Sequence, residues 1–512
     1  MKTSLTTFFT KIMQFCRSLC SFLIYLQSSS QHLARLFLRT LLLKVGRFWL
    51  QLCYFVTLFM FGYFILAFLE PRNPGHQPGN FDLLFTSVSA VTVSSMSTVE
   101  MEVFSNSQLF CLAILMLLGG EVFTSILELQ FNKFKLLEKN ESQVETNLED
   151  GLNPSKNDFN LKYKSMKFLG FIVISYFVTV QVTGFLLVSM YVGLVQSAEQ
   201  VLRNKNINIQ VFSIVTTIST FTNCGFLPTN EGMMVFKKNL GLLIILIPLV
   251  LLGNTLYPVF LRMIVTVLRK MRNREELNFV MNNQDELGYC HLLSGVDCGY
   301  LALTSFGFIM VQFAVFIPIG WKSKALDELN PLEKVVGSLF QVVNTRHTGE
   351  SVFDLSLVSP AIIVLIVTLM YLPAYTYFLP RDDNEEKVKI SYIKKKRKTK
   401  KSRGFLILSP LPFLVVIIML LCITQSENMK KDPLNFSVLN IIFEVISAYG
   451  NVGFSMGYSC ERQLQRDENC RNAWYGFAGR WSNISKLILI VVMIFGRLKK
   501  FHKRGGKAWK LS

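Results

Sequence analysis

FDLLFTSVSAVTVSSMSTVE, residues 81–100, is the stretch of this sequence that decides the fold. It follows the charge-free run Phe48–Leu69, which is long enough for a helix to cross a membrane. The stretch itself is rich in Ser, Thr and small apolar residues, and it is too short and too polar to span. Three other segments occupy the same place, each between two apolar runs: Val211–Phe226, Ser338–Glu350 and Ile441–Phe454. The repetition predicts four copies of one unit, each a short helix that runs into an irregular tip.

The four segments can be set in register at their tips. The aligned tips are Thr92–Ser95 (TVSS), Thr222–Gly225 (TNCG), Arg346–Gly349 (RHTG) and Gly450–Gly453 (GNVG). Serines lie six positions before the last tip residue in three copies (Ser89, Ser219 and Ser447), while Val343 breaks the pattern. Downstream, the motifs LLGGE at 117–121, LLGNT at 251–255 and IFGR at 494–497 resemble one another. The tip-to-tip spacings of 130, 124 and 104 residues fit span–loop–span units joined by linkers.

Long apolar runs predict the membrane spans, because a helix satisfies its own backbone groups in lipid. The runs are Phe48–Leu69, Leu109–Leu127 (broken only by Glu121), Phe168–Gln196, Leu240–Leu261, Tyr300–Trp321, Leu355–Pro380, Gly404–Ser426 and a shorter one near Leu487–Gly496. The predicted fold class is an all-α polytopic membrane protein. It has four membrane–pore-loop–membrane repeats, and thus eight transmembrane helices, around one central pore.

Domain boundaries follow from the same runs. We predict a cytoplasmic arm (1–47), repeat A (48–130), a linker (131–165), repeat B (166–269), a linker (270–295), repeat C (296–380), a basic linker (381–403), repeat D (404–500) and a basic tail (501–512). The formal charge of +19 is concentrated beside the spans: the stretch 381–404 carries eleven Lys/Arg against four acids. An excess of Lys and Arg marks the cytoplasmic side. Both termini and every linker are therefore predicted inside, and the charge does not indicate nucleic-acid binding.

Glycine at the tips suggests what the loops do. Gly225, Gly349 and Gly453 end three of the four aligned tips. Glycine permits the positive φ that turns successive carbonyl groups toward a pore axis. Such carbonyls replace the hydration shell of an ion in potassium-channel filters. A lone glycine at a loop end is more often a plain turn, but three in register favour an ion-selective pore.

Six motifs, in order along the chain, resemble the plant HKT (high-affinity potassium transporter) family of the Trk/Ktr/HKT superfamily. They are PRNPG…FDLLFTSVSAVTVSSMSTVEMEVFSNSQL, LLGGEVF, FTNCGFLPTNEGM, NTRHTGESVFDLS, AYGNVGFSMGYSC and IFGRLKKFH. The resemblance covers about Trp49 to Lys500 and implies the four-repeat fold in one polypeptide, with pairing as a homodimer left open. It also implies that Ser95, Gly225, Gly349 and Gly453 form the selectivity filter.

This Ser-Gly-Gly-Gly pattern resembles the sodium-transporting subclass I of that family, whereas four glycines accompany sodium–potassium transport. The resemblance therefore implies channel-like sodium transport, with Na⁺ held by backbone carbonyls near the filter residues. The alternative is sodium–potassium co-transport or poorly selective monovalent cation transport through the same pore. Physical reasoning points the same way, because a serine disfavours positive φ and spoils one quarter of a carbonyl ring.

Ionisable residues at membrane depth are functional candidates by default. Only ten uncharged residues separate Lys486 from Arg497 in the eighth span, so one of the two cations must be submerged. One interpretation is that Arg497 extends to the lipid surface; the other is that Arg497 or Lys486 faces the pore and limits cation flux, which the resemblance favours. Glu121 is the predicted counter-charge. Tyr371–Pro373 should break the second helix of repeat C, as a plain kink or as a loop below the filter.

Carboxylates follow the tips on the predicted outer side: Glu100, Glu102, Glu231 and Glu350. Acidic groups concentrate cations at a pore mouth, although single surface carboxylates often do nothing special. Cys460 and Cys470 share an outer loop, where a disulfide is open, and Asn435–Ser437 is a glycosylation triplet whose accessibility is also open.

The rival class, a membrane enzyme, lacks its signatures. The sequence has no GxxxxGK[ST], HExxH or GxSxG motif, and we predict no catalytic residue and no cofactor. The expected partners are Na⁺, K⁺ in the alternative, and membrane lipids, with no nucleic acid. The expected location is the plasma membrane, as a multi-pass protein.

Overall fold

The structure of the chain is a computed structural model that describes residues 47–72, 77–146, 156–272, 274–372, 410–463, 470 and 474–502. The chain divides after Thr57, inside its first described helix, into a short N-terminal unit and a large unit of residues 58–512. All sites below lie in the large unit. Every regular element in the described part of the chain is helical. The arm 1–46, the linker 381–403, Pro373 and the tail from 503 lie outside the described residues.

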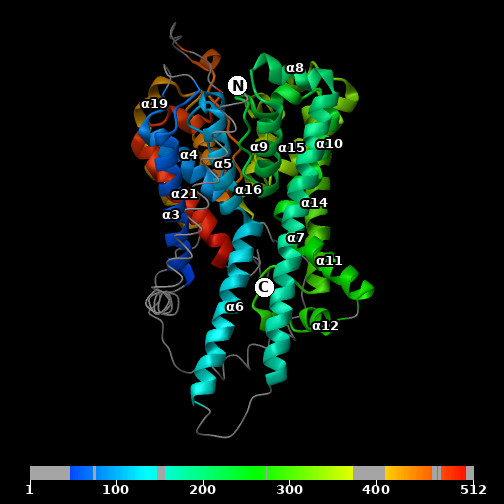
Figure 1. The fold of residues 1–512 in the computed structure, drawn as a ribbon. Coiled ribbons are helices and arrows are strands. Elements are labelled where there is room, and N and C mark those ends of the chain that lie inside the picture. Colours follow the sequence, from blue (N-terminus) through cyan, green and yellow to red (C-terminus); the bar gives the residue numbers. More distant parts are fainter. Residues whose placement is uncertain are drawn as a thin grey trace, which may run out of the picture. The chain divides into compact units, whose positions relative to one another are not determined.

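Each repeat has a first long helix, a short pore helix and a second long helix. In repeat A these are α3 (Arg47–Phe68), α4 (Asn80–Thr92) and the pair α5 (Asn106–Gly119) and α6 (Glu121–Thr146). In repeat B they are α7 (Lys156–Leu194), α9 (Ile209–Thr222) and the pair α10 (Leu240–Gly253) and α11 (Tyr257–Met271), with the short α8 (Gln196–Asn204) before the pore helix. The pore helix α9 packs against α7 and α10 of its own repeat and against α5 of repeat A, which lies next to it in Figure 1.

Repeats C and D follow the same order. Repeat C has α14 (Gly295–Gly320), α15 (Pro331–Asn344) and α16 (Pro360–Tyr371); repeat D has α18 (Pro410–Thr424), α20 (Val438–Gly450) and α21 (Asn483–His502). The short α12 (Glu275–Asn282) and α13 (Gln284–Leu287) join repeats B and C, and α19 (Ser426–Lys431) follows α18. Single 3-10 turns lie after the tips and in the loops: η1 (Met101–Val103), η2 (Gly232–Phe236), η3 (Lys324–Leu326), η4 (Leu355–Leu357), η5 (Cys460–Arg462) and η6 (Phe477–Arg480).

Length and apolar composition identify the membrane-crossing helices. Among the described helices, three are each long and apolar enough to cross a membrane, within α3, α7 and α14. The bent pairs α5–α6 and α10–α11 are also long and apolar enough if each pair is counted as one span. The described parts of α16 and α18 are 12 and 15 residues long and border residues that are not described. The 20-residue α21 carries Lys486, Arg497, Lys499 and Lys500. The molecule is an all-α polytopic membrane protein of four pore-loop repeats, as predicted.

Two predicted spans are broken where the sequence suggested continuous helices. The run Leu240–Leu261 bends by 81° between α10 and α11, and α5 bends by 51° against α6 at Gly120. The first bend has a local cause: Asn254 leaves helical geometry, and Pro258 lies in the first turn of the next helix, where proline is tolerated. Each break comes directly after a glycine that contacts a pore helix, described below.

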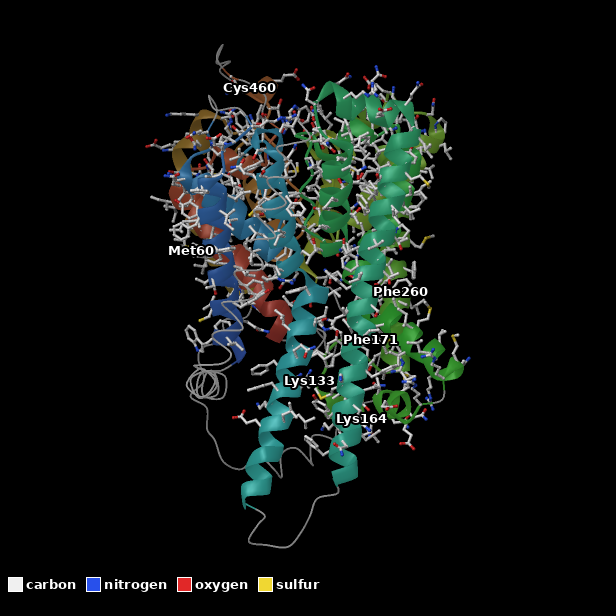
Figure 2. The ribbon with its side chains drawn as sticks, viewed as in Figure 1. Met60, Lys133, Lys164, Phe171, Phe260 and Cys460 are labelled. Atoms are coloured by element: carbon white, nitrogen blue, oxygen red, sulfur yellow. A yellow bond between two sulfur atoms is a disulfide. The ribbon has the colours of Figure 1, made fainter. Side chains whose placement is uncertain are left out.

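The pore helices are the buried centre of the fold, and the long helices have apolar outer faces. Nine of the thirteen residues of α4 are buried, among them Thr86, Ser87 and Ser89. In contrast, Phe171 is 68% exposed and many large apolar side chains along α7 are exposed, which suits contact with lipid. Figure 2 shows Lys133 and Lys164 on α6 and α7, far from Cys460 at the opposite end of the molecule.

Candidate functional site: the ring of four tips

Each tip begins where a pore helix ends. Three of the four helices end in a residue with left-handed geometry: Val93 (φ 58°), Asn223 (φ 60°) and Asn451 (φ 51°). The helix ends carry partial negative charge from their unpaired carbonyl groups, which favours a cation nearby. The C-terminal ends of the four pore helices would therefore favour a positive ion between the tips.

All four predicted filter residues have a positive backbone φ angle. Their φ angles are 51° at Ser95, 94° at Gly225, 63° at Gly349 and 102° at Gly453. Glycine adopts positive φ without strain, whereas for a residue with a Cβ the left-handed region costs roughly 1–2 kcal/mol. Ser95 is thus held in a strained conformation by its surroundings, and it occupies the same position in its repeat as the three glycines.

The tips touch one another from repeat to repeat. A Cβ placed on Gly225 would lie 2.9 Å from Ser95 Oγ and 1.9 Å from the Thr348 carbonyl oxygen. One placed on Gly349 would lie 2.4 Å from the Val452 carbonyl oxygen. The contacts thus run from repeat A to B, from B to C and from C to D.

Gly453 closes this ring. A Cβ there would lie 2.2 Å from Ser95 Cβ and 2.8 Å from the Ser94 carbonyl oxygen, which joins repeat D to repeat A. The Asn451 amide also donates to Ser94 Oγ at 2.8 Å. Backbone atoms of one tip therefore fill the space beside the glycine of the next, and the four tips form one continuous structure.

The serines that the register singled out hold the tips. Ser219 Oγ accepts a hydrogen bond from the Gly225 amide at 2.9 Å, and Ser447 Oγ accepts one from the Gly453 amide at 3.0 Å. Repeat A differs, because Ser89 Oγ has no hydrogen-bond partner among the described residues. The tip that contains Ser95 is instead fixed through Ser94, which also bonds Thr92 Oγ1 at 2.8 Å.

The downstream glycines receive the ends of the pore helices. A Cβ on Gly253 would lie 1.6 Å from the Phe221 carbonyl oxygen. The equivalent distances are 2.0 Å from Gly119 to Val91 and 2.2 Å from Gly496 to Tyr449. Only glycine leaves room for this close approach of a carbonyl group to a helix.

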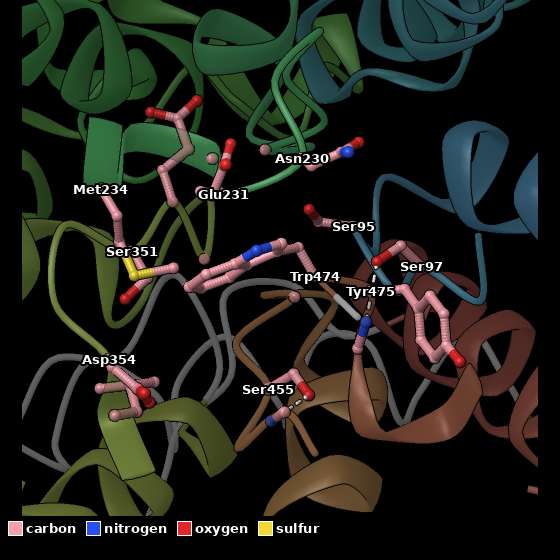
Figure 3. Close-up of a pocket in the computed structure, with 18 of the residues that line it drawn as sticks. Ser95, Ser97, Asn230, Glu231, Met234, Ser351, Asp354, Ser455, Trp474 and Tyr475 are labelled. Atoms are coloured by element: carbon pink, nitrogen blue, oxygen red, sulfur yellow. Dashed lines mark hydrogen bonds between the residues drawn. The ribbon is translucent and has the colours of Figure 1, made fainter. Parts of the chain in front are cut away.

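A cavity of about 190 Å³ lies against the ring, on the side of the residues that follow the tips in the chain. It is lined by residues of all four repeats, including Ser95, Gly225, Gly349 and Gly453. Figure 3 shows Trp474 across this cavity, between Met234 and Ser351 on one side and Ser97 on the other. We call this cavity the tip-side vestibule. Its wall includes the four predicted filter residues, so the vestibule borders the ring directly.

The predicted mouth carboxylates do not stand as four equal groups around the vestibule. Only Glu231 and Glu350 line it. Glu350 is 2% exposed and accepts a hydrogen bond from Thr220 Oγ1 at 2.7 Å, which ties repeat C to repeat B. Glu100 accepts from the Asn230 amide at 3.3 Å and from the Trp474 backbone amide at 3.2 Å.

Lys205, which the sequence did not single out, pairs with two of these carboxylates. Its Nζ lies 2.6 Å from Glu102 and 2.6 Å from Glu231. Partial burial lowers the pKa of this amine, but the hydrogen bonds and charges of the two carboxylates outweigh burial and raise the pKa above its ordinary value. The two carboxylates are therefore partly neutralised, and Asp354 is a further acid on the vestibule wall.

Arg497 and Glu121 form a buried ion pair on the other side of the ring. Arg497 Nη1 donates to Glu121 Oε2 at 2.9 Å, and Nη2 donates to the Gly119 carbonyl oxygen at 2.6 Å. The exposed fractions are 2% for Arg497 and 3% for Glu121. Arg497 therefore points into the bundle and does not extend to the lipid surface, and Glu121 is its counter-charge.

Lys486 lies at the opposite end of α21. Its Nζ donates to Asp82 Oδ1 at 2.8 Å, in the first turn of pore helix α4. An acidic group in the first turn of a helix is favoured by the helix dipole, so Asp82 suits both the helix and the lysine. The two cations thus lie at opposite ends of α21, and each pairs with a different carboxylate.

Two open questions of the sequence are decided by the geometry. Cys460 and Cys470 form a disulfide. Asn435 is fully buried, and its amide donates to Asp432 Oδ2 and to the Ser459 carbonyl oxygen, both at 2.9 Å. Its triplet is therefore not presented for glycosylation in the folded chain. The helix α16 ends at Tyr371, and the predicted break at Pro373 lies outside the described residues.

Fold and site together define a class: a polytopic membrane protein whose four pore loops meet in one ring. A sequence profile of the TrkH family, described as a cation transport protein, matches residues 72–376 and 393–502. The chain belongs to this family. It is a cation transport protein of the membrane and not an enzyme.

Plant relatives cover nearly the whole chain. The sodium transporter HKT1 of Arabidopsis thaliana is 46% identical, over 87% of this chain and 91% of its own length. The cation transporter HKT1;3 of Oryza sativa subsp. japonica is 44% identical, over 90% and 91%. The crystal structure of the potassium transporter TrkH from Vibrio parahaemolyticus covers 89% of this chain and 83% of its own, with a TM-score of 0.49 and 13% identity.

Proposed function

We propose that this protein carries sodium ions across the membrane through the ring of tips, with Ser95, Gly225, Gly349 and Gly453 as its selectivity filter. The observation that carries the proposal is the closed ring of four left-handed residues, of which one alone has a side chain. Potassium is passed selectively by filters whose carbonyls replace its water on all sides. Ser95 places a Cβ and a hydroxyl where the other repeats have only backbone, and it makes one quarter of the ring unlike the rest.

The relatives support sodium as the ion. A protein 46% identical to this chain is described as a sodium transporter. The second candidate is sodium–potassium transport through the same pore, and the three glycines of the ring favour it because they retain most of a symmetric carbonyl cage.

The reversal potential of current in voltage-clamped cells that express the chain tests both candidates. With external sodium exchanged for potassium, a potential that follows sodium with its Nernst slope and ignores potassium supports the sodium proposal. A potential that tracks both ions equally supports the second candidate. The absence of any cation current at normal surface expression contradicts both.

We further propose that Arg497 limits the flux, because its charge lies one residue after the glycine that contacts a pore-helix end. Arg497→Gln is expected to raise inward cation current several-fold. The amide can still donate toward Glu121 while the fixed positive charge, which repels cations in the pathway, is gone. Whole-cell conductance normalised to surface protein measures the effect, with Lys486→Gln as the matched control because that lysine pairs at the far end of α21. Equal conductance in Arg497→Gln and wild type would remove the flux-limiting role.

The remaining expectations stand as proposals. They are the repeat boundaries 48–130, 166–269, 296–380 and 404–500, a plasma-membrane location with both termini in the cytoplasm, lipid contact of the apolar outer faces, and a homodimer. The proposed mouth role of Glu100, Glu102, Glu231 and Glu350 is supported by the vestibule position of Glu231 and Glu350. It is weakened for Glu102 and Glu231, because both carboxylates pair with Lys205.

A further inference from the structure

His291 joins the buried ion pair from a part of the chain outside the four repeats. It lies between α13 and α14, in the segment that connects repeats B and C. Its Nε2 lies 3.1 Å from Glu121 Oε1, while Arg497 holds the other carboxylate oxygen. His291 is 5% exposed. One carboxylate of repeat A is thus held on one side by repeat D and on the other by the connecting segment.

An aromatic and hydroxyl cluster fixes the imidazole in place. The rings of Tyr257 and Tyr289 lie 5.4 Å and 5.6 Å from the His291 ring. The two tyrosine hydroxyls are 2.6 Å apart, and Tyr289 also bonds Ser125 Oγ of α6 at 2.8 Å. Contacts with two aromatic rings restrict the orientation of His291 and favour the position of its Nε2 beside Glu121.

The contact between His291 and Glu121 lies close to the two bends in the second helices of repeats A and B. Glu121 and Tyr257 each begin the helix that follows a bend, and each bend follows a glycine that receives the end of a pore helix. Movement of the connecting segment therefore acts directly on the carboxylate that neutralises Arg497. A buried carboxylate that loses a hydrogen-bond donor must find another, which changes how it pairs with its cation.

We propose that His291 is a positioning residue for Arg497: it holds Glu121 in the orientation that neutralises the arginine and so couples the B–C connecting segment to cation flux. The inference rests on the proposed transport function and on the proposed role of Arg497. Without the imidazole, Glu121 turns away, the arginine charge is less well compensated, and cations entering the pathway meet stronger repulsion.

Two amides of different length test the contact. The side-chain nitrogen of His291→Gln reaches about as far as Nε2, whereas that of His291→Asn falls one bond short. We expect His291→Asn to lower inward sodium current several-fold at equal surface expression, and His291→Gln to restore at least half of the wild-type current. Asn132→Ala is the control for simple docking of the segment, because Asn132 donates to the Gly288 carbonyl oxygen at 3.0 Å and so ties α6 to the segment through its backbone. We expect it to leave the current unchanged.

A double variant separates positioning from a general loss of stability. In the Arg497→Gln background, His291→Asn should have no further effect on the current, since no arginine charge remains for Glu121 to neutralise. An equal effect of His291→Asn in both backgrounds, equal currents for His291→Asn and wild type, or the same loss in His291→Gln would each overturn the inference. If wild-type protein at the surface carries no cation current, the transport proposal itself fails, and the two failures are thus distinguishable.

Discussion

Gly453→Ala is expected to lower cation current by more than about tenfold, through two separate costs. The φ of 102° at this position suits glycine, and positive φ for a residue with a Cβ costs roughly 1–2 kcal/mol. The added methyl group would also lie 2.2 Å from Ser95 Cβ and 2.8 Å from the Ser94 carbonyl oxygen. Both neighbours belong to the tip of repeat A, so the overlap is relieved only by moving that tip and opening the ring.

The matched control is Gly307→Ala on α14, where an added Cβ meets nothing within 4 Å. It should carry wild-type current. Surface labelling must accompany both measurements, because a variant that does not reach the membrane carries no current for another reason. Unchanged flux in Gly453→Ala at normal surface level would contradict the four-tip pathway, whatever the ion.

Ser95→Gly is expected to admit potassium, with a shift of the reversal potential toward that of a pore that carries both ions. The substitution removes the strain of a non-glycine residue at φ 51°, worth roughly 1–2 kcal/mol, and makes the fourth tip like the other three. A more symmetric ring of carbonyls should serve the larger and less strongly hydrated ion better. The measurement is the reversal potential in mixtures of external sodium and potassium.

Ser95→Ala separates the two properties of the serine. Alanine keeps the Cβ and its strain but lacks the hydroxyl, which lies beside Gly225 in the neighbouring tip. If the Cβ decides selectivity, Ser95→Ala stays sodium-selective while Ser95→Gly does not. If Ser95→Gly retains the sodium selectivity of the wild type, the serine is not the selector and the proposal for this residue is wrong.

Much of the fold was open to prediction because its signals are local. Charge-free runs mark the spans, and the Ser/Thr-rich stretches at 81–100 and 211–226 became α4 and α9. The alignment of the tips rested on the glycines, and its physical basis is the shared positive φ. The serines six positions earlier aligned because two of them bond the tip amides.

What could not be predicted depends on contacts between residues far apart in the chain. The 81° bend after Gly253 was hidden inside an apolar run, since hydropathy does not register the carbonyl of Phe221 beside that glycine. In the sequence, nothing distinguishes Lys205 from any other lysine in a loop. Its importance becomes visible only when the structure places two carboxylates beside it. His291 lies in a connecting segment without a recognisable motif, and its rarity as a histidine was the one available signal.

The closed contact of the four tips has a consequence for how such a pore can change. In an assembly of four identical subunits, a substitution appears four times at once, and the pore remains symmetric. Here each repeat has its own tip sequence, so a side chain such as that of Ser95 occurs in one tip only, and Arg497 places its charge in one repeat only. The other three tips keep glycine at the aligned position. If the ring acts as the filter we propose, selectivity and conductance can be adjusted one repeat at a time, and only the two adjoining tips must accommodate each change.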